Sequence, residues 1–218
     1  VDNTPGDDTA QRIRWAHPGV HVLPQQKNLG FGRGNNVVLD RLDSEYHLLI
    51  NPDVTFEPDL LPNMVRYMDE HPNAVILTPR VLNADGSEQF LPKKLPTVHY
   101  LLSGFLERLG KPFTTWRAEY TMAGQRVNAP VKVHFATGCF LLIRTETFRK
   151  LHGFDERFFL YQEDSDLSRR AGMLGPIIYH PQMCVTHAWA RENTRTLRGV
   201  MRQVRSIIQY FIKWGVSW

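Results

Sequence analysis

The sequence predicts an α/β fold in which a mostly parallel sheet is covered by helices on both faces. The first observation is an alternation, in which strand-like runs at 47–50 and 74–78 enclose an amphipathic helix pattern at 58–68. The second is that the run at 74–78 is continuously apolar through Val75, Ile76 and Leu77, which is typical of a strand buried on both faces. Alternation of strands with helices is the pattern of a parallel sheet.

The composition indicates one globular domain with a substantial core. Of the 218 residues, 42% are hydrophobic and 22% are charged. The net charge of +4 is mildly basic and lacks dense Lys/Arg blocks, so we expect no nucleic-acid partner. Cys139 and Cys184 form no CxxC motif, which excludes a disulfide framework and a zinc knuckle and favours the reducing cytoplasm. No apolar run is long enough for a spanning helix.

Further strands and a helix are expected along the chain. Strand patterns cover 131–144 and 177–185, and a short helix is expected at 146–151 between them. Near the start, two valines flank a histidine at 20–22, which predicts a short strand. These elements would extend the sheet that the first alternation begins.

Two segments lie outside the alternation. Residues 83–129 are interpreted as an insertion with a helix at 100–109, and a segment of this kind is more often functional than passive, for instance as an acceptor-binding lid. Residues 194–214 have the pattern of an amphipathic helix. Its apolar face would carry Leu197, Val200, Met201, Val204, Ile207, Ile208 and Phe211, with Arg198, Arg202, Arg205 and Gln209 opposite. Such a helix either packs on its own domain or lies on an anionic membrane, and the pattern does not decide.

A glycine-rich stretch, Asn28-Leu-Gly-Phe-Gly-Arg-Gly-Asn-Asn36, precedes an expected helix that carries Val37 and Leu42. Its three glycines permit close approach of the backbone to a ligand, and a helix N-terminus favours an anion. The spacing is not the GxGxxG dinucleotide fingerprint, because Asn35 stands where the third glycine would be, and no Walker A motif follows. Taken alone, the stretch would be interpreted as a plain turn.

Polar residues follow two of the expected strands. Asn51-Pro-Asp53 comes directly after 47–50, and His187 comes just after 177–185. Open α/β sheets bind ligands at the carboxyl ends of their strands, although Asn-Pro-Asp is also good turn chemistry. The positions therefore indicate a candidate ligand site without proving one.

An acidic stretch follows the aromatic and apolar run 158–161. Glu163, Asp164 and Asp166 fall in the first turn of an expected helix, where the helix dipole favours carboxylates. One interpretation is therefore an ordinary acidic helix start. The other is a general base at the mouth of an apolar pocket, where desolvation and neighbouring like charges raise its pKa.

These pieces in this order resemble the inverting family 2 glycosyltransferases of the GT-A fold. The matching pieces are Val1-Asp-Asn3, Asn28 to Asn36, Asn51-Pro-Asp53, and Gly153-Phe-Asp followed by Glu163-Asp-Ser-Asp166. The subgroup that they resemble most is the bacterial rhamnosyltransferases of O-antigen and cell-wall polysaccharide assembly. Family members carry a strand and a helix before the Val-Asp-Asn turn, so we expect an N-terminally incomplete GT-A domain over 1–192 and a C-terminal amphipathic helix over 193–218.

The resemblance implies a donor site and a metal site. The nucleotide-sugar donor would contact Asp2 and the glycine-rich stretch, and the divalent metal, Mg²⁺ or Mn²⁺, would sit on its diphosphate. Asp53 matches the last acid of the DxD motif that holds this metal, and His187 matches a metal-binding histidine. Asn51 stands in place of the first acid, a departure that leaves fewer charged ligands. Within the glycine-rich stretch, the matching donor residues are Asn28, Gly30 and Asn35.

The resemblance also implies the catalytic groups. Asp164 matches the aspartate of the "ED" motif, which is the general base. Glu163 and Asp166 would support the helix start and orient the acceptor. Gly138 and Cys139 match the strand segment beside the donor sugar and the acceptor.

The resulting hypothesis is a metal-dependent hexosyltransferase that moves rhamnose or a similar sugar to a lipid-linked or polysaccharide acceptor in bacterial surface-glycan assembly. It would work in the cytoplasm, with peripheral contact at the inner face of the plasma membrane. The alternative is a catalytically silent remnant or a sugar- or partner-binding domain, whose unpaired sheet edge could support a dimer. A nucleotidyltransferase is less favoured, because Arg33 is the only basic residue of the glycine-rich stretch and no lysine follows it to hold a triphosphate.

Overall fold

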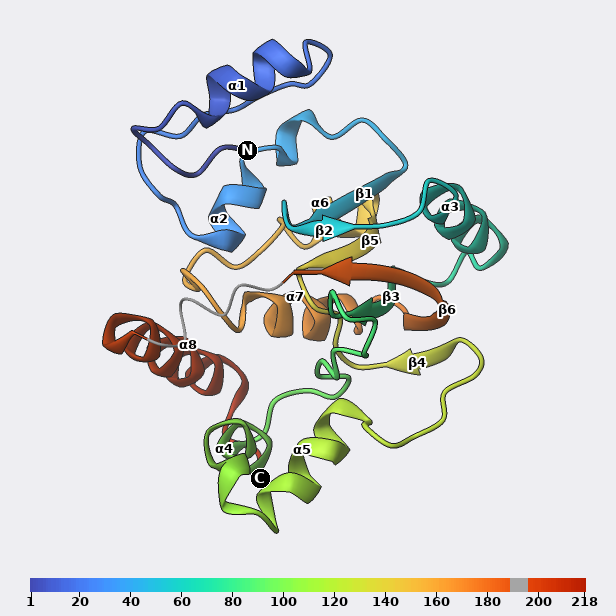
Figure 1. Cartoon of the computed structure of the whole chain (residues 1–218), viewed down its shortest axis with the longest axis vertical. Coiled ribbons are helices and arrows are strands. Elements are labelled where there is room, and N and C mark those ends of the chain that lie inside the picture. The colour runs from blue at the N-terminus through green and yellow to red at the C-terminus, as the bar shows by residue number, and fades with distance from the viewer. Residues whose placement is uncertain (189–195) are drawn as a thin grey trace.

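The computed structural model describes residues 1–188 and 196–218. The helices are α1 (Thr9–Ala16), α2 (Phe31–Asn36), α3 (Leu60–Glu70), α4 (Val98–Leu106), α5 (Phe113–Thr121), α6 (Thr145–Lys150), α7 (Glu163–Ala171) and α8 (Leu197–Trp214), with 3₁₀ turns η1 (Leu39–Arg41) and η2 (Glu107–Leu109). The strands are β1 (Tyr46–Ile50), β2 (Val54–Thr55), β3 (Ile76–Leu82), β4 (Val131–Val133), β5 (Phe140–Arg144) and β6 (Ile177–His187). Figure 1 shows one sheet with helices around it.

The strand order is β1-β5-β3-β6-β2, and β4 pairs with β6. β5 runs antiparallel to both β1 and β3, and β2 and β4 run antiparallel to β6. Among the strands of the described residues, β3 and β6 are the one pair that runs in parallel. The expectation of a mostly parallel sheet is therefore wrong in strand direction, although the α/β class is confirmed. The alternation along the chain correctly predicts that β1 and β3 point the same way. It could not predict that β5, entered from β4 without a crossover helix, lies between them.

The core has two layers, one on each face of the sheet. Alternate residues of β5 serve the two layers, with Leu141 and Ile143 on one side and Phe140 and Leu142 on the other. The first layer packs against Phe148 of α6 and Leu167 and Ala171 of α7, and the second against Leu60, Met64 and Met68 of α3. Helices thus cover both faces, as predicted, and the first layer fixes α7 against the sheet.

Several local expectations differ from the structure. The strand expected at 20–22 does not form, and pairing there is limited to a single bridge between Asp2 and Pro24. The helix expected after the glycine-rich stretch instead begins inside it, at Phe31. Helices α1 and α5 were not predicted, because α1 buries no residue and α5 has no clear apolar face. In Figure 1, α1 lies at the opposite end of the molecule from α4 and α5.

The C-terminal helix α8 packs on its own domain. Ser206 Oγ donates to the carbonyl of Leu160 at 2.8 Å, and Tyr210 is fully buried. The expected domain boundary at 192 and the expected helix start at 194 lie outside the described residues. Across the ranges 1–188 and 196–218, no helix combines the length and apolar character needed to cross a membrane.

Candidate active site

Three strand ends and the start of α7 meet at one edge of the sheet. β1 ends at Ile50, β6 ends at His187, and β5 begins at Phe140 on the same edge because it runs antiparallel to β1. The loop before β5 carries Gly138, which contacts Asp164 of α7. This is the edge at which α/β sheets of this kind bind ligands.

Asp164 lies at the entrance of α7 and is half-buried. Its Oδ2 accepts from the backbone N–H of Gly138 at 3.3 Å, and its Oδ1 accepts from the N–H of Ser165 at 2.8 Å. Burial raises the pKa of Asp164 to about 6, against the lowering effect of these backbone hydrogen bonds. A carboxylate with this pKa is ionised at neutral pH and still able to take a proton, which is the requirement for a general base.

Glu163 and Gln162 form a buried polar pair beside Asp164. Glu163 Oε2 and Gln162 Oε1 have no hydrogen-bond partner among the described residues. Burial, followed by the charge of Asp164, raises the pKa of Glu163 well above its usual range. Tyr161 and Gln162 both have positive φ, at 70° and 66°, which is uncommon for side chains of this size and is often found at functional sites.

A chain of contacts runs from Asp164 to the strand-end residues. Gly138 gives its N–H to Asp164, and the carbonyl of the next residue, Cys139, accepts from the N–H of Asn51 at 2.9 Å. Cys139 itself is buried in the core, and burial raises the pKa of its thiol to about 12, so its side chain is a packing group. The charges of Asp164 and Asp53 also raise the pKa of this thiol, because both carboxylates lie near it.

Pairing of β2 with β6 brings Asp53 and His187 together. Val54 is paired with His187, and Ala188 N–H donates to the carbonyl of Asp53 at 3.1 Å. As a result, Asp53 Oδ1 lies 3.3 Å from His187 Nε2, although the two residues are far apart in the sequence. Asp53 is partly exposed and His187 is buried, so an ion bound here would be reached from solvent on the Asp53 side.

Gln89 fixes the orientation and the proton of His187. Its Nε2 donates to the carbonyl of His187 at 2.7 Å, so its Oε1 must face the ring and accept a hydrogen bond. Oε1 lies 3.2 Å from His187 Nδ1, which therefore carries the N–H. In the neutral ring, Nε2 then presents its lone pair to the carboxylate of Asp53. Two lone pairs at 3.3 Å require a proton or a cation between them.

This arrangement fits a divalent metal. Two donor atoms that share an octahedral Mg²⁺ lie roughly 3 Å from one another, close to the separation of the Asp53 and His187 atoms. Among the residues that the structure describes, no three His, Cys, Asp or Glu side chains are placed to share an ion. Asp53 and His187 would therefore be a two-residue metal site, which is usual for an ion that also binds substrate phosphates. Gln89 was not predicted, because nothing in its sequence context distinguishes it.

The glycine-rich stretch packs against its own chain. A side chain at Gly30, where φ is +83°, would collide with the carbonyl of Phe159, and a Cβ at Gly32 would lie 2.8 Å from Cβ of Phe154. Gly34 is similarly close to Asn3. Gly30 and Gly32 therefore let α2 approach the loop that leads into α7, and contact of the glycine-rich stretch with a ligand stays a prediction. The close approach is between protein segments.

The expected donor residues have partners within the chain. Asn28 Oδ1 accepts from the N–H of Gly30, and Asn35 Nδ2 donates to the carbonyl of Phe31, each at 2.9 Å. Asp2 Oδ1 accepts from the hydroxyl of Thr4 at 2.6 Å, and hydrogen bonds from Thr4 lower the pKa of Asp2. These contacts shape the segment, and nucleotide binding by these residues stays a prediction.

Asn3 joins the N-terminal segment to the glycine-rich stretch. Its Nδ2 donates to the carbonyl of Gly30 at 2.9 Å, and its Oδ1 accepts from the N–H of Leu29 at 2.8 Å. Sequence reasoning gave Asn3 no role, although the Val-Asp-Asn turn was part of the resemblance. Its amide group holds the turn and the stretch in one unit beside α2.

Asp166 does not face a ligand. Its side chain has no exposed surface and binds Arg170 Nε at 2.7 Å, Lys213 Nζ at 2.6 Å and Trp214 Nε1 at 2.8 Å. The expectation that Asp166 orients the acceptor is therefore wrong, because both of its oxygens are occupied by the chain itself. The residue instead links α7 to α8.

Known proteins of similar sequence and structure are glycosyltransferases. A family model described as glycosyl transferase family 2 matches residues 1–152. The N-acetylglucosaminyl-diphospho-decaprenol L-rhamnosyltransferase of Mycobacterium tuberculosis is 30% identical over 213 residues, which cover 89% of this chain and 67% of that protein. Rhamnosyltransferase WbbL of Escherichia coli is 23% identical over 194 residues, which cover 84% of this chain and 70% of that protein.

Among solved structures, mannosyltransferase PcManGT from Pyrobaculum calidifontis, in complex with GDP-Man and Mn²⁺, has a TM-score of 0.58 at 15% identity. The match covers 97% of this chain, which spans only 52% of that one. The architecture is thus the GT-A fold of nucleotide-sugar transferases. The chain belongs to glycosyl transferase family 2, and the two relatives described above are rhamnosyltransferases. The family match ends before α7, so the assignment of Asp164 as the base depends on geometry.

Proposed function

We propose that this chain is the catalytic domain of an inverting glycosyltransferase. It moves rhamnose or a similar hexose from a nucleoside-diphosphate donor to a lipid-linked or glycan acceptor. The observation that carries the proposal is the state of Asp164, a carboxylate with a pKa raised to about 6 at the sheet edge that also holds Asp53 and His187. The acceptor class comes from the names of the rhamnosyltransferase relatives.

The reaction is a single displacement at the anomeric carbon. The acceptor hydroxyl oxygen forms a bond to that carbon while its proton passes to Asp164, and the bond from the carbon to the diphosphate oxygen breaks. The electron pair of that bond leaves with the nucleoside diphosphate. Burial and the charge of Asp164 raise the pKa of Glu163 well above its usual range, which disfavours ionisation of Glu163 and leaves Asp164 as the proposed base. A single displacement of this kind inverts the configuration of the anomeric carbon.

A divalent cation, Mg²⁺ or Mn²⁺, would be held by Asp53 and His187. When bound, it would neutralise charge on the diphosphate leaving group. The chain's own contribution is the arrangement of the two donor atoms, which the β2–β6 pairing and Gln89 maintain. Asn51 stands in place of a further acid, so we expect a modest affinity for the metal alone and a higher affinity when the donor is present.

The insertion at 83–129 is proposed to border the acceptor. It contributes α4 and α5, and α5 forms one wall of an open cavity of about 300 Å³. The cavity is also lined by Gln89, whose side chain supports His187, and by Glu88 and Arg117. A polar cavity next to the supports of the metal pair suits a sugar acceptor, whose hydroxyls need several hydrogen-bonding partners.

The experiment that tests the base is Asp164→Asn. Transfer from dTDP-rhamnose or UDP-sugars to a polyprenyl-diphosphate saccharide should fall by roughly 10²- to 10⁴-fold, while donor binding remains. Asp43→Asn, an exposed carboxylate outside the site, is the matched control and should not change the rate. A folded Asp164→Asn protein with an undiminished rate would overturn the assignment.

Calorimetry separates an enzyme from a silent domain. Titration of dTDP- and UDP-sugars should show binding that depends on Mn²⁺, because Asp53 and His187 are proposed to hold the ion on the diphosphate. Absence of metal-dependent binding for all donors would support the silent-domain alternative instead.

A further inference from the structure

Helix α8 packs on the domain with a face of mixed character, which carries small residues and one large aromatic residue. The buried residues are Gly199, Ser206 and Tyr210, which follow one another at helical spacing. Near the end of the helix, Lys213 and Trp214 also turn inward and bind Asp166. Val200, Ile207 and Phe211 lie beside this face and are half-buried, so α8 buries only part of its apolar side.

The apolar residues of α8 form two groups, and the group that faces away from the domain is exposed. The exposed residues are Leu197, Met201, Val204, Ile208 and Ile212, with exposed fractions between 43% and 77%. Their spacing of four, three, four and four residues places them in one line along the helix. Single exposed apolar residues are ordinary, but a continuous line on one helix indicates a surface that meets a partner. We call this line the outer stripe.

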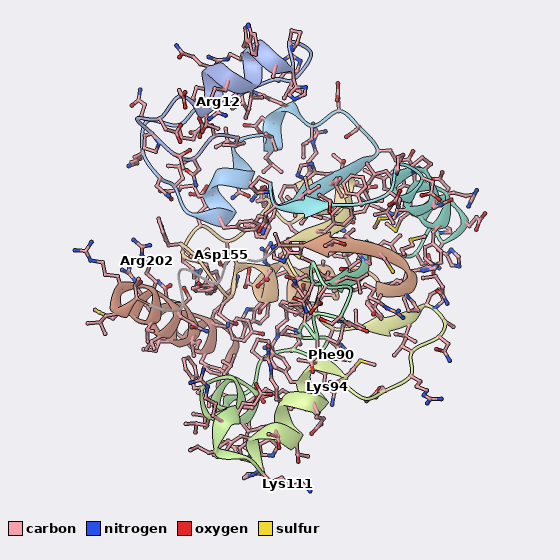
Figure 2. All side chains as sticks on the ribbon, in the orientation of Figure 1. Arg12, Phe90, Lys94, Lys111, Asp155 and Arg202 are labelled. Atoms are coloured by element: carbon pink, nitrogen blue, oxygen red, sulfur yellow. The ribbon has the colours of Figure 1, made fainter. Side chains whose placement is uncertain are left out.

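Basic residues lie directly beside the outer stripe. At 100° per residue, Arg198, Arg202 and Arg205 follow the stripe on one side of the helix, and all three are exposed. Residues 197–214 contain no Asp or Glu. In Figure 2, Arg202 lies at the outer edge of the molecule on α8, and Asp155 lies next to the helix on its inner side. Arg202 also stands 5.0 Å from the ring of Phe159, which holds its side chain over the surface.

We propose that the outer stripe and its arginines form a docking surface for an anionic lipid bilayer. The helix would lie in the plane of the membrane interface, with Leu197, Ile208 and Ile212 among the acyl chains and the arginines at the lipid phosphates. A second copy of this chain fits less well, because a second α8 would offer the arginines no carboxylate. Beyond the helix, Val216 and Trp218 are also exposed, and tryptophan favours the membrane interface.

The contacts of Asp166 tie this surface to the active site. Lys213 and Trp214 of α8 both bind Asp166, which lies two residues after Asp164 on α7. Lys213 also bridges to Asp155 at 2.7 Å, in the loop that leads into α7. A membrane-bound α8 would therefore hold the proposed base at a fixed position above the lipid surface. This last step rests on the proposed function, since it supposes a lipid-linked acceptor.

The test is flotation of the full chain with vesicles. Vesicles of phosphatidylglycerol and phosphatidylcholine should carry the protein, and pure phosphatidylcholine vesicles should carry much less. The double variant Ile208→Asn with Ile212→Asn should bind the anionic vesicles about tenfold or more weakly, because two apolar side chains that would enter the bilayer are lost. The control is Met173→Asn with Leu174→Asn, two exposed apolar residues outside α8, which should bind as the unaltered protein does.

A second pair of variants tests the charge. Arg198→Gln with Arg205→Gln should weaken binding by about tenfold and flatten its dependence on salt. Circular dichroism shows whether each variant is folded, and all altered positions are exposed. Failure of the unaltered protein to bind anionic vesicles, or equal binding by the isoleucine variant, would overturn the proposal. Sedimentation that shows a dimer abolished by the isoleucine variant would assign the stripe to a second copy instead.

Donor calorimetry on the same variants separates this proposal from the proposed function. Loss of vesicle binding with unchanged donor binding supports the docking surface. Absent donor binding in the unaltered protein would contradict the proposed function and leave the vesicle result standing.

Discussion

Asp164 and Glu163 are adjacent carboxyl groups whose environments differ. Asp164 is half-buried and accepts two backbone hydrogen bonds, whereas Glu163 is buried with one oxygen that has no partner among the described residues. Burial raises both pKa values, and the charge of Asp164 raises that of Glu163 further. Ionisation of Glu163 is therefore disfavoured by its burial and by the neighbouring carboxylate, which makes Asp164 the candidate base. The sequence predicted the two acids, but only their burial separates the base from its neighbour.

The pKa of Asp164 predicts a pH dependence of transfer. The rate at low substrate concentration should rise with pH through about 6, because the base acts only when ionised. The measurement is a profile of kcat/KM from about pH 5 to 8 with a fixed excess of Mn²⁺. A rate that falls over this range would contradict the assignment.

The contribution of Asp164 to the stability of the fold should fall as pH rises, whereas the transfer rate should increase. The folded-state pKa of Asp164 lies above its ordinary value of 3.8, so the folded protein holds a proton that the unfolded chain releases. The stability from this group is present below about pH 4 and is lost as pH rises through about 6. Asp164→Asn should therefore gain Tm relative to the unaltered protein as pH rises from about 4 to 7. Thermal unfolding measures the difference in Tm between Asp164→Asn and the unaltered protein, with Asp43→Asn as the control. A difference in Tm that stays constant or shrinks as pH rises would contradict this prediction.

Gln89 provides a prediction about the metal site that does not depend on turnover. Gln89→Leu removes the acceptor of His187 Nδ1–H and should weaken Mn²⁺ binding in the presence of dTDP by roughly 10- to 100-fold. Electron paramagnetic resonance measures free Mn²⁺ directly. Gln89→Glu keeps an acceptor and should retain most of the affinity, whereas Gln182→Leu, on the exposed side of β6, should change nothing.

The tautomer of His187 is a second readout of the same contact. Long-range ¹H–¹⁵N spectra should show the proton on Nδ1 in the unaltered protein, and a mixture of tautomers in Gln89→Leu. A single Nδ1–H tautomer in the variant, with unchanged Mn²⁺ affinity, would show that Gln89 only packs.

At the scale of elements, the sequence predicted most helices and strands but not how they meet. The apolar periodicity of α3 and the apolar run in β3 gave the correct element types, since both depend on burial alone. The position of β5 between β1 and β3 depends on contacts between distant segments, which no local pattern carries. The glycine-rich stretch shows the same limit. Its composition indicated a close approach, and the structure shows that the partner is the loop before α7.

The packing of α2 predicts a large effect at Gly30. Gly30→Ala places a Cβ against the Phe159 carbonyl at a φ of +83°, so the free energy of unfolding should fall by about 2 kcal/mol or more. Gly104→Ala is the matched control, because it lies inside α4 with nothing near its Cβ, and it should raise stability by up to about 1 kcal/mol. Urea unfolding measures both. Equal effects of the two substitutions would show that the close approach at Gly30 is not tight.

At the scale of the whole molecule, α8 is joined to the sheet through α7. Asp166 is the centre of this joint, with Arg170 on its own helix and Lys213 and Trp214 on α8. The amphipathic pattern of α8 was recognised in the sequence, but the face that packs could not be predicted. Hydrophobic periodicity assigns burial to the whole apolar side, whereas here the contacts of Lys213 and Trp214 with Asp166 turn the helix so that part of that side stays exposed.

Asp166→Asn should therefore loosen α8 as well as destabilise the fold. Asn keeps the size of the side chain but removes the buried charge, and leaves Arg170 and Lys213 without their shared carboxylate, so stability should fall by about 3–5 kcal/mol. Because Lys213 loses its carboxylate partner and Trp214 keeps only a neutral acceptor, deuterium exchange should speed up more for the amides of α8 than for those of α3. Glu156→Gln breaks an exposed pair with Arg33 and should cost less than about 1 kcal/mol, with no change in α8 exchange. If the amides of α8 and α3 exchanged faster by the same factor in Asp166→Asn, the loss of stability would be global. Asp166 would then not be a specific link between α8 and α7.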